Sequence, residues 1–415
     1  FYTPKPIVEY MCRESIIAYL QDERYSAAGN ELIRKFVETQ DVELLNEAQR
    51  DTIEKKLRTV KICDPAIGSG AFPMGLVNIM SKLFIVLGTF PTAEQGTMKR
   101  HIMEQSIYGV DIEQGAVDIA RLRFWLAMVV DEDVASPLPN LHFKIMQGNS
   151  LLESYKGKDL SRLTEVRMGG ADSLNLECYA AKELIHFLKK FYNESHHGER
   201  KRILNTITSN VLKQIHELTQ NESFMDDVKD ISANDRFFLW HTWFVDVFEQ
   251  GGFDIVIGNP PYIQLQKSLG VIAKDKRGRD YELKLGDLYA NAGYEVFAKT
   301  GDIYCLFYEL GFKLLKAGGH LCYITSNKWM RAGYGDKLRE FFATKTNPEI
   351  LLDFGGVQVF ESATVDTNIL LFAKGENKGS TRAATATKDL LDGGFNLSNF
   401  MEHNAGACDF RTSQS

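Results

Sequence analysis

An amide side chain, two prolines and an aromatic ring follow one another in the tetrapeptide Asn259, Pro260, Pro261 and Tyr262. The apolar run 253–257 before it predicts a buried strand, and the prolines exclude a helix directly after that strand. The side-chain oxygen of Asn259 and the carbonyl oxygen of Pro260 can each accept one hydrogen of an exocyclic amino group, which stabilises charge developing on its nitrogen. Tyr262 would stack on the base that carries this amino group. The alternative is a proline turn without a catalytic role.

A glycine-rich turn at residues 64–72 and an acid about 40 residues later form a second constellation. Glycines let the backbone approach a ligand closely, and the turn leads into the N-terminus of a predicted helix. Asp111 ends the next apolar run, where a carboxylate can accept both hydroxyl hydrogens of a ribose. It could instead cap the helix that follows it. The candidate ligand residues of the turn are Asp64, Pro65, Ala66, Gly68, Gly70 and Phe72.

Alternating strand and helix patterns surround these residues. Apolar runs at 60–63, 107–110 and 142–146 alternate with helical periodicity at 72–87 and 113–130, which predicts a parallel sheet covered by helices. Further strands are expected at 253–257, 320–325, 350–354 and 368–373, with a helix at 304–316 between them.

This pattern divides the chain into segments. Residues 1–58 read as N-terminal helices, and residues 59–374 as the α/β domain, interrupted by a helical insertion at about 151–235 and by a mobile loop at about 264–299. Residues 375–415 lose the strand pattern and are expected to be a linker or the start of a truncated domain. The absence of an initial Met and the polar tail suggest a piece of a longer protein.

Composition narrows the class of protein. Six scattered cysteines without paired spacing, together with His186, His196 and His197 in a polar helical stretch, predict neither zinc nor a disulfide framework, so no metal is expected. Without a membrane span or signal peptide, a cytoplasmic protein is expected. The net charge of −7 argues against binding of nucleic acid over the whole surface but not against a local basic cleft.

The basic run from Lys274 to Arg279 either touches phosphates or is a solvated loop. The aromatic pattern around Trp240 and Trp243 is expected to pack against the sheet.

The order of these motifs resembles the gamma-class DNA N6-adenine methyltransferases, in particular the modification module of type IIG restriction-modification enzymes and related phage-defence methylases. The resemblance runs from residue 1 to about 374 and is weakest at 151–235. It implies a Rossmann-like S-adenosylmethionine-dependent methyltransferase fold with a mixed seven-stranded sheet and helices on both faces. It also implies double-stranded DNA as substrate, a flipped-out adenine, and a separate C-terminal target-recognition domain. No nuclease signature is recognised.

The resemblance also implies roles for individual residues. The segment at 1–4 matches the one that covers the methionine end of the cofactor, and Asp111 matches the ribose-binding acid. Asn149 stands where an aspartate is usual near the cofactor's adenine ring, and 326–329 and 363–368 resemble downstream signatures. Phe360 is a candidate for packing on the target base, with a core aromatic as the alternative. The further candidates are Tyr2, Thr3, Pro4, Ile112 and Ser150 for the cofactor and Lys328 for the substrate.

Two other functions remain open at this point. A methyltransferase acting on a glutamine amide or on an RNA base would use the same tetrapeptide, because it faces the same weakly nucleophilic nitrogen. A non-catalytic subunit could keep the cofactor pocket alone, although it would have no need for Asn259, Pro260 and Tyr262.

Overall fold

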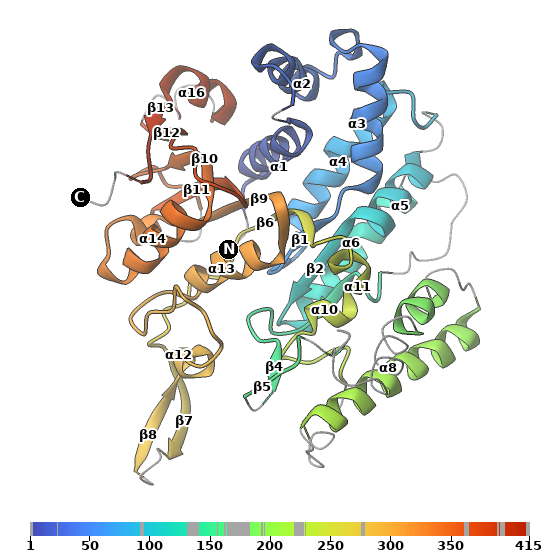
Figure 1. Cartoon of the computed structure of the whole chain (residues 1–415), viewed down its shortest axis with the longest axis vertical. Helices are drawn as coiled ribbons and strands as arrows, with labels where there is room; N and C mark the ends of the chain where they lie inside the picture. The colour runs from blue at the N-terminus through green and yellow to red at the C-terminus, as the bar shows by residue number, and fades with distance from the viewer. Residues whose placement is uncertain are drawn as a thin grey trace, which may run out of the picture.

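The computed structural model describes residues 3–22, 24–91, 95–130, 141–155, 157–161, 163, 183–191, 194, 196–219, 228, 230–274, 279–360, 365–387, 390 and 395–411. Within them, a nine-stranded sheet forms the centre of the molecule in the order β13-β12-β10-β11-β9-β6-β1-β2-β3 (Figure 1). Its strands are β1 (Ile62–Asp64), β2 (Ile107–Asp111), β3 (Ile145–Gln147), β6 (Phe253–Gly258), β9 (Leu315–Ser326), β10 (Asn347–Asp353), β11 (Thr367–Ala373), β12 (Thr381–Thr385) and β13 (Gly406–Cys408).

The strand directions make this a mixed sheet. Strands β3, β2, β1, β6 and β9 run parallel to one another, whereas β11 is antiparallel to both β9 and β10. The predicted mixed α/β sheet is confirmed: seven strands, from β3 to β10, form it, and β12 and β13 extend it at one edge.

Helices cover both faces of the sheet because side chains alternate along its strands. In β6, Ile255 and Ile257 belong to one hydrophobic cluster, and Phe253 and Val256 belong to the other. The first cluster includes α1 (Lys5–Leu20), α2 (Ala27–Thr39), α3 (Glu47–Thr59), α4 (Ala71–Val86), α5 (Gln95–Ser106), α6 (Gln114–Val129) and α16 (Leu397–Asn404). The second includes α8 (His197–Thr219), α10 (Trp240–Trp243), α11 (Val245–Phe248), α13 (Ile303–Leu314) and α14 (Asp336–Lys345).

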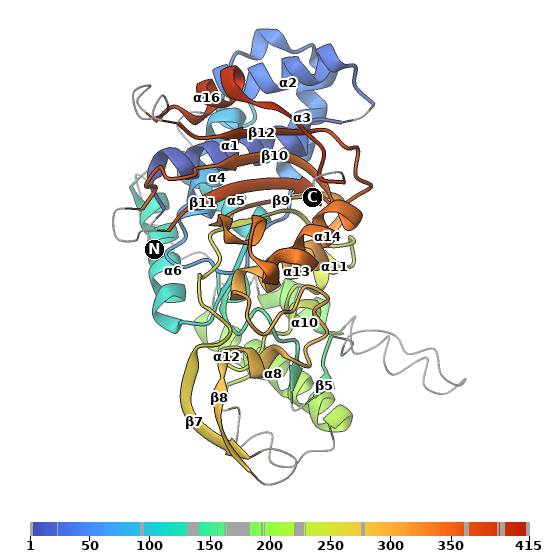
Figure 2. The same ribbon diagram turned by 90° about the vertical axis from the view of Figure 1, so that its left-hand side faces the viewer.

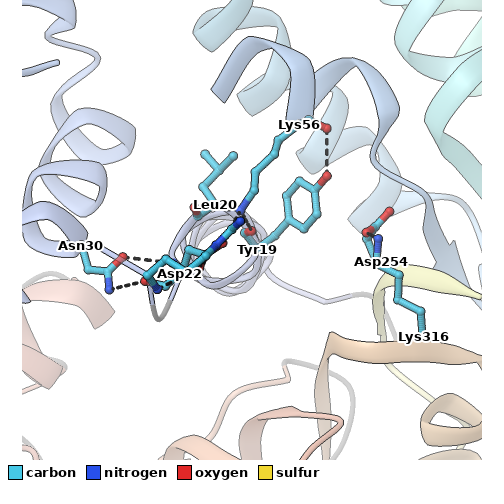
Figure 3. A network of polar contacts seen from close by, with 8 residues as sticks. Tyr19, Leu20, Asp22, Asn30, Lys56, Asp254 and Lys316 are labelled. Carbon is cyan, nitrogen blue, oxygen red and sulfur yellow. Dashed lines mark hydrogen bonds and ion pairs between the residues drawn. The ribbon is translucent and has the colours of Figure 1, made fainter. Parts of the chain in front are cut away.

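The N-terminal helices are joined to one another by buried polar contacts (Figure 3). The Lys56 ammonium group of α3 donates to the carbonyl oxygens of Tyr19 and Leu20 at 3.2 Å each, and the Tyr19 hydroxyl donates to the Lys56 carbonyl at 2.9 Å. Asn30 and Asp22 exchange two further hydrogen bonds between α2 and the end of α1. Helix α1 also packs against α4 and β9, so the described N-terminal helices help to build the first hydrophobic cluster.

The segment after residue 374, expected from sequence to be a linker or the start of a truncated domain, contributes strands to the central sheet. Strand β12 pairs in parallel with β10, β13 pairs with β12, and α16 packs close to α1 (Figure 2). Its buried side chains are Leu397, Phe400 and Met401. The expected boundary at residue 374 therefore falls inside the sheet, because β12 is short and its small residues lack the long apolar run that identifies a buried strand.

The described parts of the segment 264–299, expected from sequence to be a mobile loop, contain regular secondary structure. They contain an antiparallel hairpin of β7 (Ser268–Lys274) and β8 (Asp280–Lys284), followed by the short helix α12 (Leu285–Tyr289). Its basic residues and glycines obscured the weak apolar alternation of the two strands. In the insertion, the described parts include α8 and a small hairpin of β4 (Ser154–Tyr155) and β5 (Lys158–Asp159).

Candidate active site

A cavity of about 440 Å³ lies at the carboxyl ends of β1, β2, β3 and β6. Ligands of α/β proteins bind at this edge of the sheet, and the volume lies within the range of ligand pockets. The predicted site residues that line it are Thr3, Asp64, Pro65, Ala66, Gly68, Phe72, Asp111, Ile112, Asn149, Ser150, Asn259 and Pro261. Residues far apart in the chain therefore meet at one cavity.

The glycine-rich turn is fastened to the acid after β2. The backbone N–H of Gly68 donates to one carboxylate oxygen of Asp111 at 2.8 Å, and the N–H of Glu113 donates to the other at 3.0 Å. Gly68 and Gly70 have φ angles of 52° and 77°, a region that favours glycine. Asp111 thus contacts the N-cap residue of α6, Glu113, and its side chain also lines the cavity.

Asp64 and Gly258 bring the glycine-rich turn against the end of β6. The Asp64 side chain is buried and accepts a hydrogen bond from the N–H of Ala66 at 3.1 Å. Burial, with the nearby negative charge of Asp111, raises the pKa of the Asp64 carboxyl well above its usual range. A Cβ atom on Gly258 would lie 2.6 Å from the Asp64 Oδ1 atom, so only glycine permits this approach.

The side chain of Asn259 is oriented by the N-terminal segment. Its Nδ2 atom donates to the Thr3 hydroxyl at 3.1 Å, and Thr3 is itself buried. The Asn259 Oδ1 atom is buried and has no hydrogen-bond partner among the residues that the structure describes. A buried acceptor without a partner costs free energy. A ligand that donates a hydrogen bond to the Asn259 Oδ1 atom would remove this cost.

Tyr262 lies beside the cavity and is not part of its lining. Its hydroxyl donates to the carbonyl of Ile324 at 3.2 Å, and its ring centroid is 6.3 Å from that of Phe360 and 6.0 Å from that of Tyr304. Burial raises the pKa of the Tyr262 phenol well above its usual range, so the hydroxyl remains a donor. Phe360 is buried in the first hydrophobic cluster, as the core-aromatic interpretation requires.

Asn149 and Ser150 connect the end of β3 to the rest of the site. The Ser150 hydroxyl donates to the carbonyl of Pro65 at 2.6 Å, which ties this segment to the glycine-rich turn. Asn149 accepts from the N–H of Leu151 at 3.2 Å and donates to the Tyr289 hydroxyl at 3.3 Å. The Asn149 oxygen keeps a second lone pair, because a carboxamide oxygen accepts two hydrogen bonds.

Several predicted residues lie elsewhere. Pro4 is the N-cap residue of α1, Gly70 is the N-cap residue of α4, and Pro260 is buried next to the cavity without being part of its lining. Lys328 is exposed on the short 3-10 helix η3 (Asn327–Met330), and Tyr2 lies outside the described residues.

Sequence reasoning missed part of the cavity wall. The most informative omissions are two apolar pairs at helical i,i+4 spacing, which are Leu285 and Tyr289 on α12 and Ile303 and Phe307 on α13. The spacing itself was a usable signal, but the first pair lay in a segment expected to be a loop.

The downstream signatures are joined by hydrogen bonds, and the tryptophans belong to the core. Trp329 donates from its indole nitrogen to the Asn368 side-chain oxygen at 3.0 Å, which links η3 to β11. Thr364 and Ala363 lie outside the described residues. Trp240 and Trp243 are buried, and Trp243 stacks on Phe143 at 5.4 Å, which confirms the expected packing against the sheet.

No cluster of three or more His, Cys, Asp or Glu side chains that could hold a metal ion occurs among the described residues. None of the described helices has both the length and the apolar character needed to cross a membrane.

Comparison with protein families identifies the chain. The family of Eco57I restriction-modification methylases matches residues 105–360, more than half of the sequence. The chain belongs to this family. The matched region of the methylase contains Asp111, Asn149 and the 259–262 tetrapeptide, whereas the glycine-rich turn lies before it.

Individual relatives agree with the methylase family. RM.MjaORFECS2P of Methanocaldococcus jannaschii, which bears the name of a type II restriction enzyme and methyltransferase, is 25% identical over 90% of this chain and 35% of its own length. RM.Eco57I of Escherichia coli, a type II restriction enzyme and methyltransferase, is 33% identical over 30% of this chain and 11% of its own length. This chain therefore spans about a third or less of the relatives it matches.

A solved structure shows the same fold. A nuclease-deletion mutant of the type ISP restriction-modification enzyme LlaGI, in complex with a DNA substrate mimic, superimposes with a TM-score of 0.51. The superposition covers 98% of this methylase chain and 26% of the LlaGI chain at 12% identity, so the likeness concerns the fold alone.

Proposed function

We propose that this chain is the catalytic part of a restriction-modification enzyme that methylates the N6 amino group of adenine in double-stranded DNA, with S-adenosylmethionine as cofactor. The unpartnered Oδ1 atom of Asn259 carries the proposal. A buried acceptor at the end of a parallel strand, next to a ligand-sized cavity, matches the requirement of an amino-group substrate. Family membership supports a methylase, and adenine and the cofactor are the specific parts of the proposal.

The cavity offers complementary groups for the proposed cofactor. Asp111 presents carboxylate oxygens to which a ribose can donate its hydroxyl hydrogens, and Asn149 presents an amide that can pair with the exocyclic amine of an adenine ring. Leu285, Ile303 and Phe307 supply an apolar wall. S-adenosylmethionine, when bound, supplies an electrophilic methyl group.

The protein's own contribution to the reaction is to hold and polarise the adenine amino group. Asn259 Oδ1 and the Pro260 carbonyl oxygen accept the two amino hydrogens, which aims the nitrogen lone pair and stabilises its developing positive charge. Thr3 keeps Asn259 in this orientation through its hydrogen bond to Nδ2. The adenine must leave the duplex to reach Asn259, and Tyr262, three residues further along the chain, supplies an aromatic ring beside that position.

Two substitutions separate cofactor binding from methyl transfer. Asp111→Ala should abolish the micromolar-range S-adenosylmethionine binding that we expect of the parent in calorimetric titration, because the ribose loses its acceptor. Asn259→Ala should keep cofactor binding within about threefold and lower methyl transfer to unmethylated phage DNA by at least about 100-fold, as loss of one transition-state acceptor does.

Mass spectrometry of the DNA then tests the methylated base. N6-methyladenine in the product supports the proposal. A well-folded parent without cofactor binding, or an Asn259→Ala variant that transfers methyl groups at the parental rate, would overturn it. Methylated cytosine, RNA or protein in place of methylated adenine would replace the proposed substrate with another amino group.

We also propose that residues 1–415 do not suffice for target recognition, which a separate domain supplies. With this chain alone, methylation should be slow or weakly selective among adenines. Rapid methylation of adenines in one specific sequence by this chain alone would contradict this part of the proposal.

A further inference from the structure

The β7–β8 hairpin is anchored next to the catalytic turn. The N–H of Leu285 donates to the carbonyl of Lys267 at 2.9 Å, and the N–H of Gly286 donates to the carbonyl of Leu265 at 2.8 Å. Leu265 donates in turn to the carbonyl of Gly301 at 2.9 Å. Because Leu285 also lines the cavity, the base of the hairpin is part of the wall of the candidate active site.

Beyond this base the hairpin projects away from the body of the molecule (Figures 1 and 2). Apolar side chains are exposed along it: Val271 is 51%, Ile272 66% and Tyr281 41% exposed. Ala273 pairs with Tyr281 and Ile272 pairs with Glu282, so Tyr281 and Ile272 expose apolar surface on opposite faces of the ribbon. A two-stranded hairpin is marginally stable without a further packing partner, so exposed apolar side chains of this kind indicate a surface that binds something.

Charge indicates what the hairpin binds. Residues 267–284 contain six Lys and Arg against three Asp and Glu, whereas the whole chain has a net charge of −7. Lys274 and Arg279 stand at the outer ends of β7 and β8, and Lys267 and Lys284 stand at the base. A local excess of positive charge on an acidic protein is complementary to a phosphate backbone.

We propose that the β7–β8 hairpin is a DNA-binding ribbon that lies against the duplex next to the target adenine. This inference rests on the proposed function. Its Lys274 and Arg279 side chains contact phosphates, and its exposed Val271, Ile272 and Tyr281 side chains contact sugars and base edges. A two-stranded ribbon is narrow enough to enter the major groove. Anchoring at Leu265 and Gly286 couples this contact to the cavity that receives the flipped base.

A charge variant tests the phosphate contacts. Lys274→Gln with Arg279→Gln should weaken binding of a fluorescein-labelled DNA duplex about tenfold and lower the slope of log Kd against log salt by about two. S-adenosylmethionine affinity should stay at the parental value. The matched control is Lys35→Gln with Lys55→Gln, which removes two exposed charges from α2 and α3 at the opposite end of the molecule (Figure 1).

An apolar variant tests the apolar contacts of the ribbon. Tyr281→Ser with Val271→Ser should weaken duplex binding several-fold while leaving the salt slope unchanged, because no charge is lost. Parental DNA affinity in both the charge and the apolar variant would overturn the inference and indicate that the hairpin binds another protein segment.

Methyl transfer by the parent separates the two proposals. A parent that methylates DNA together with hairpin variants that behave like the control overturns the hairpin inference alone. A parent that binds DNA through the hairpin and transfers no methyl group overturns only the proposed function. A parent that neither binds nor methylates DNA overturns both.

Discussion

The catalytic turn after β6 and the glycine-rich turn after β1 approach each other closely because residue 258 is a glycine. Gly258 ends β6 directly before Asn259, and a side chain there would meet the buried Asp64 carboxyl. Gly258→Ala should therefore displace either the catalytic turn or the glycine-rich turn. We expect methyl transfer to fall by at least about tenfold, since small displacements of reacting groups are costly. Methyl transfer and cofactor affinity measured side by side check this expectation.

Gly115→Ala is the matched control for Gly258→Ala. Gly115 lies in the first turn of α6, where an added Cβ atom meets nothing within 4 Å. The Gly115→Ala variant should keep parental activity and gain a few tenths of a kcal/mol in stability, because alanine favours the helix. Equal activities of the two glycine variants would show that the contact between Asp64 and β6 is not restrictive.

The strand β3 is preceded by a buried lysine that should make stability depend on pH. The Lys144 ammonium group contacts the Tyr108 hydroxyl at 2.5 Å, and Tyr108 donates to Asp246 at 3.0 Å. Burial lowers the pKa of Lys144 from 10.5 to about 7. Between pH 7 and 10.5 the unfolded chain therefore binds a proton that the folded chain lacks, and stability rises with pH.

Lys144→Met should remove this pH dependence. In the parent, Lys144 contributes a slope of at most about 1.4 kcal/mol per pH unit to the free energy of unfolding in that window, and none below about pH 7. Urea unfolding at two pH values within the window checks the difference between parent and variant. Lys55→Met, at an exposed position on α3, should keep the parental slope. Identical slopes in all three proteins would contradict the lowered pKa.

Both ends of the chain pack together and stabilise the central sheet. Helix α16 packs near α1, its Leu397, Phe400 and Met401 side chains are buried in the first cluster, and β12 covers the edge of β10. A chain ending at residue 374 loses these contacts and exposes an unpaired strand edge. We expect its Tm to fall by more than about 10 °C, or the chain to aggregate.

A single substitution in the full chain tests the same packing without removing residues. Met401→Ala in the full chain should cost about 2–4 kcal/mol and lower the Tm by several degrees, whereas Asn399→Ala at an exposed position of α16 should have a much smaller effect. Calorimetry measures both. A parental Tm in the truncated chain and in Met401→Ala would make residues 375–415 a dispensable linker after all.

The locally encoded parts of this protein were readable from sequence. The strands around Asp64, Asp111 and Asn259 follow from apolar runs, and the glycine-rich turn follows from residue types with special backbone freedom. Because parallel strands end at the same edge of a sheet, their last residues had to meet at one cavity.

Other features depend on contacts between distant parts of the chain, which local sequence patterns do not predict. Thr3 meets Asn259 across 256 positions, α12 contributes Leu285 and Tyr289 from a segment that reads as a loop, and β12 joins the sheet with hardly any apolar signal. The unpartnered oxygen of Asn259 is of the same kind: its residue type is in the sequence, but its burial and its lack of a partner exist only once the sheet and the N-terminal segment enclose it.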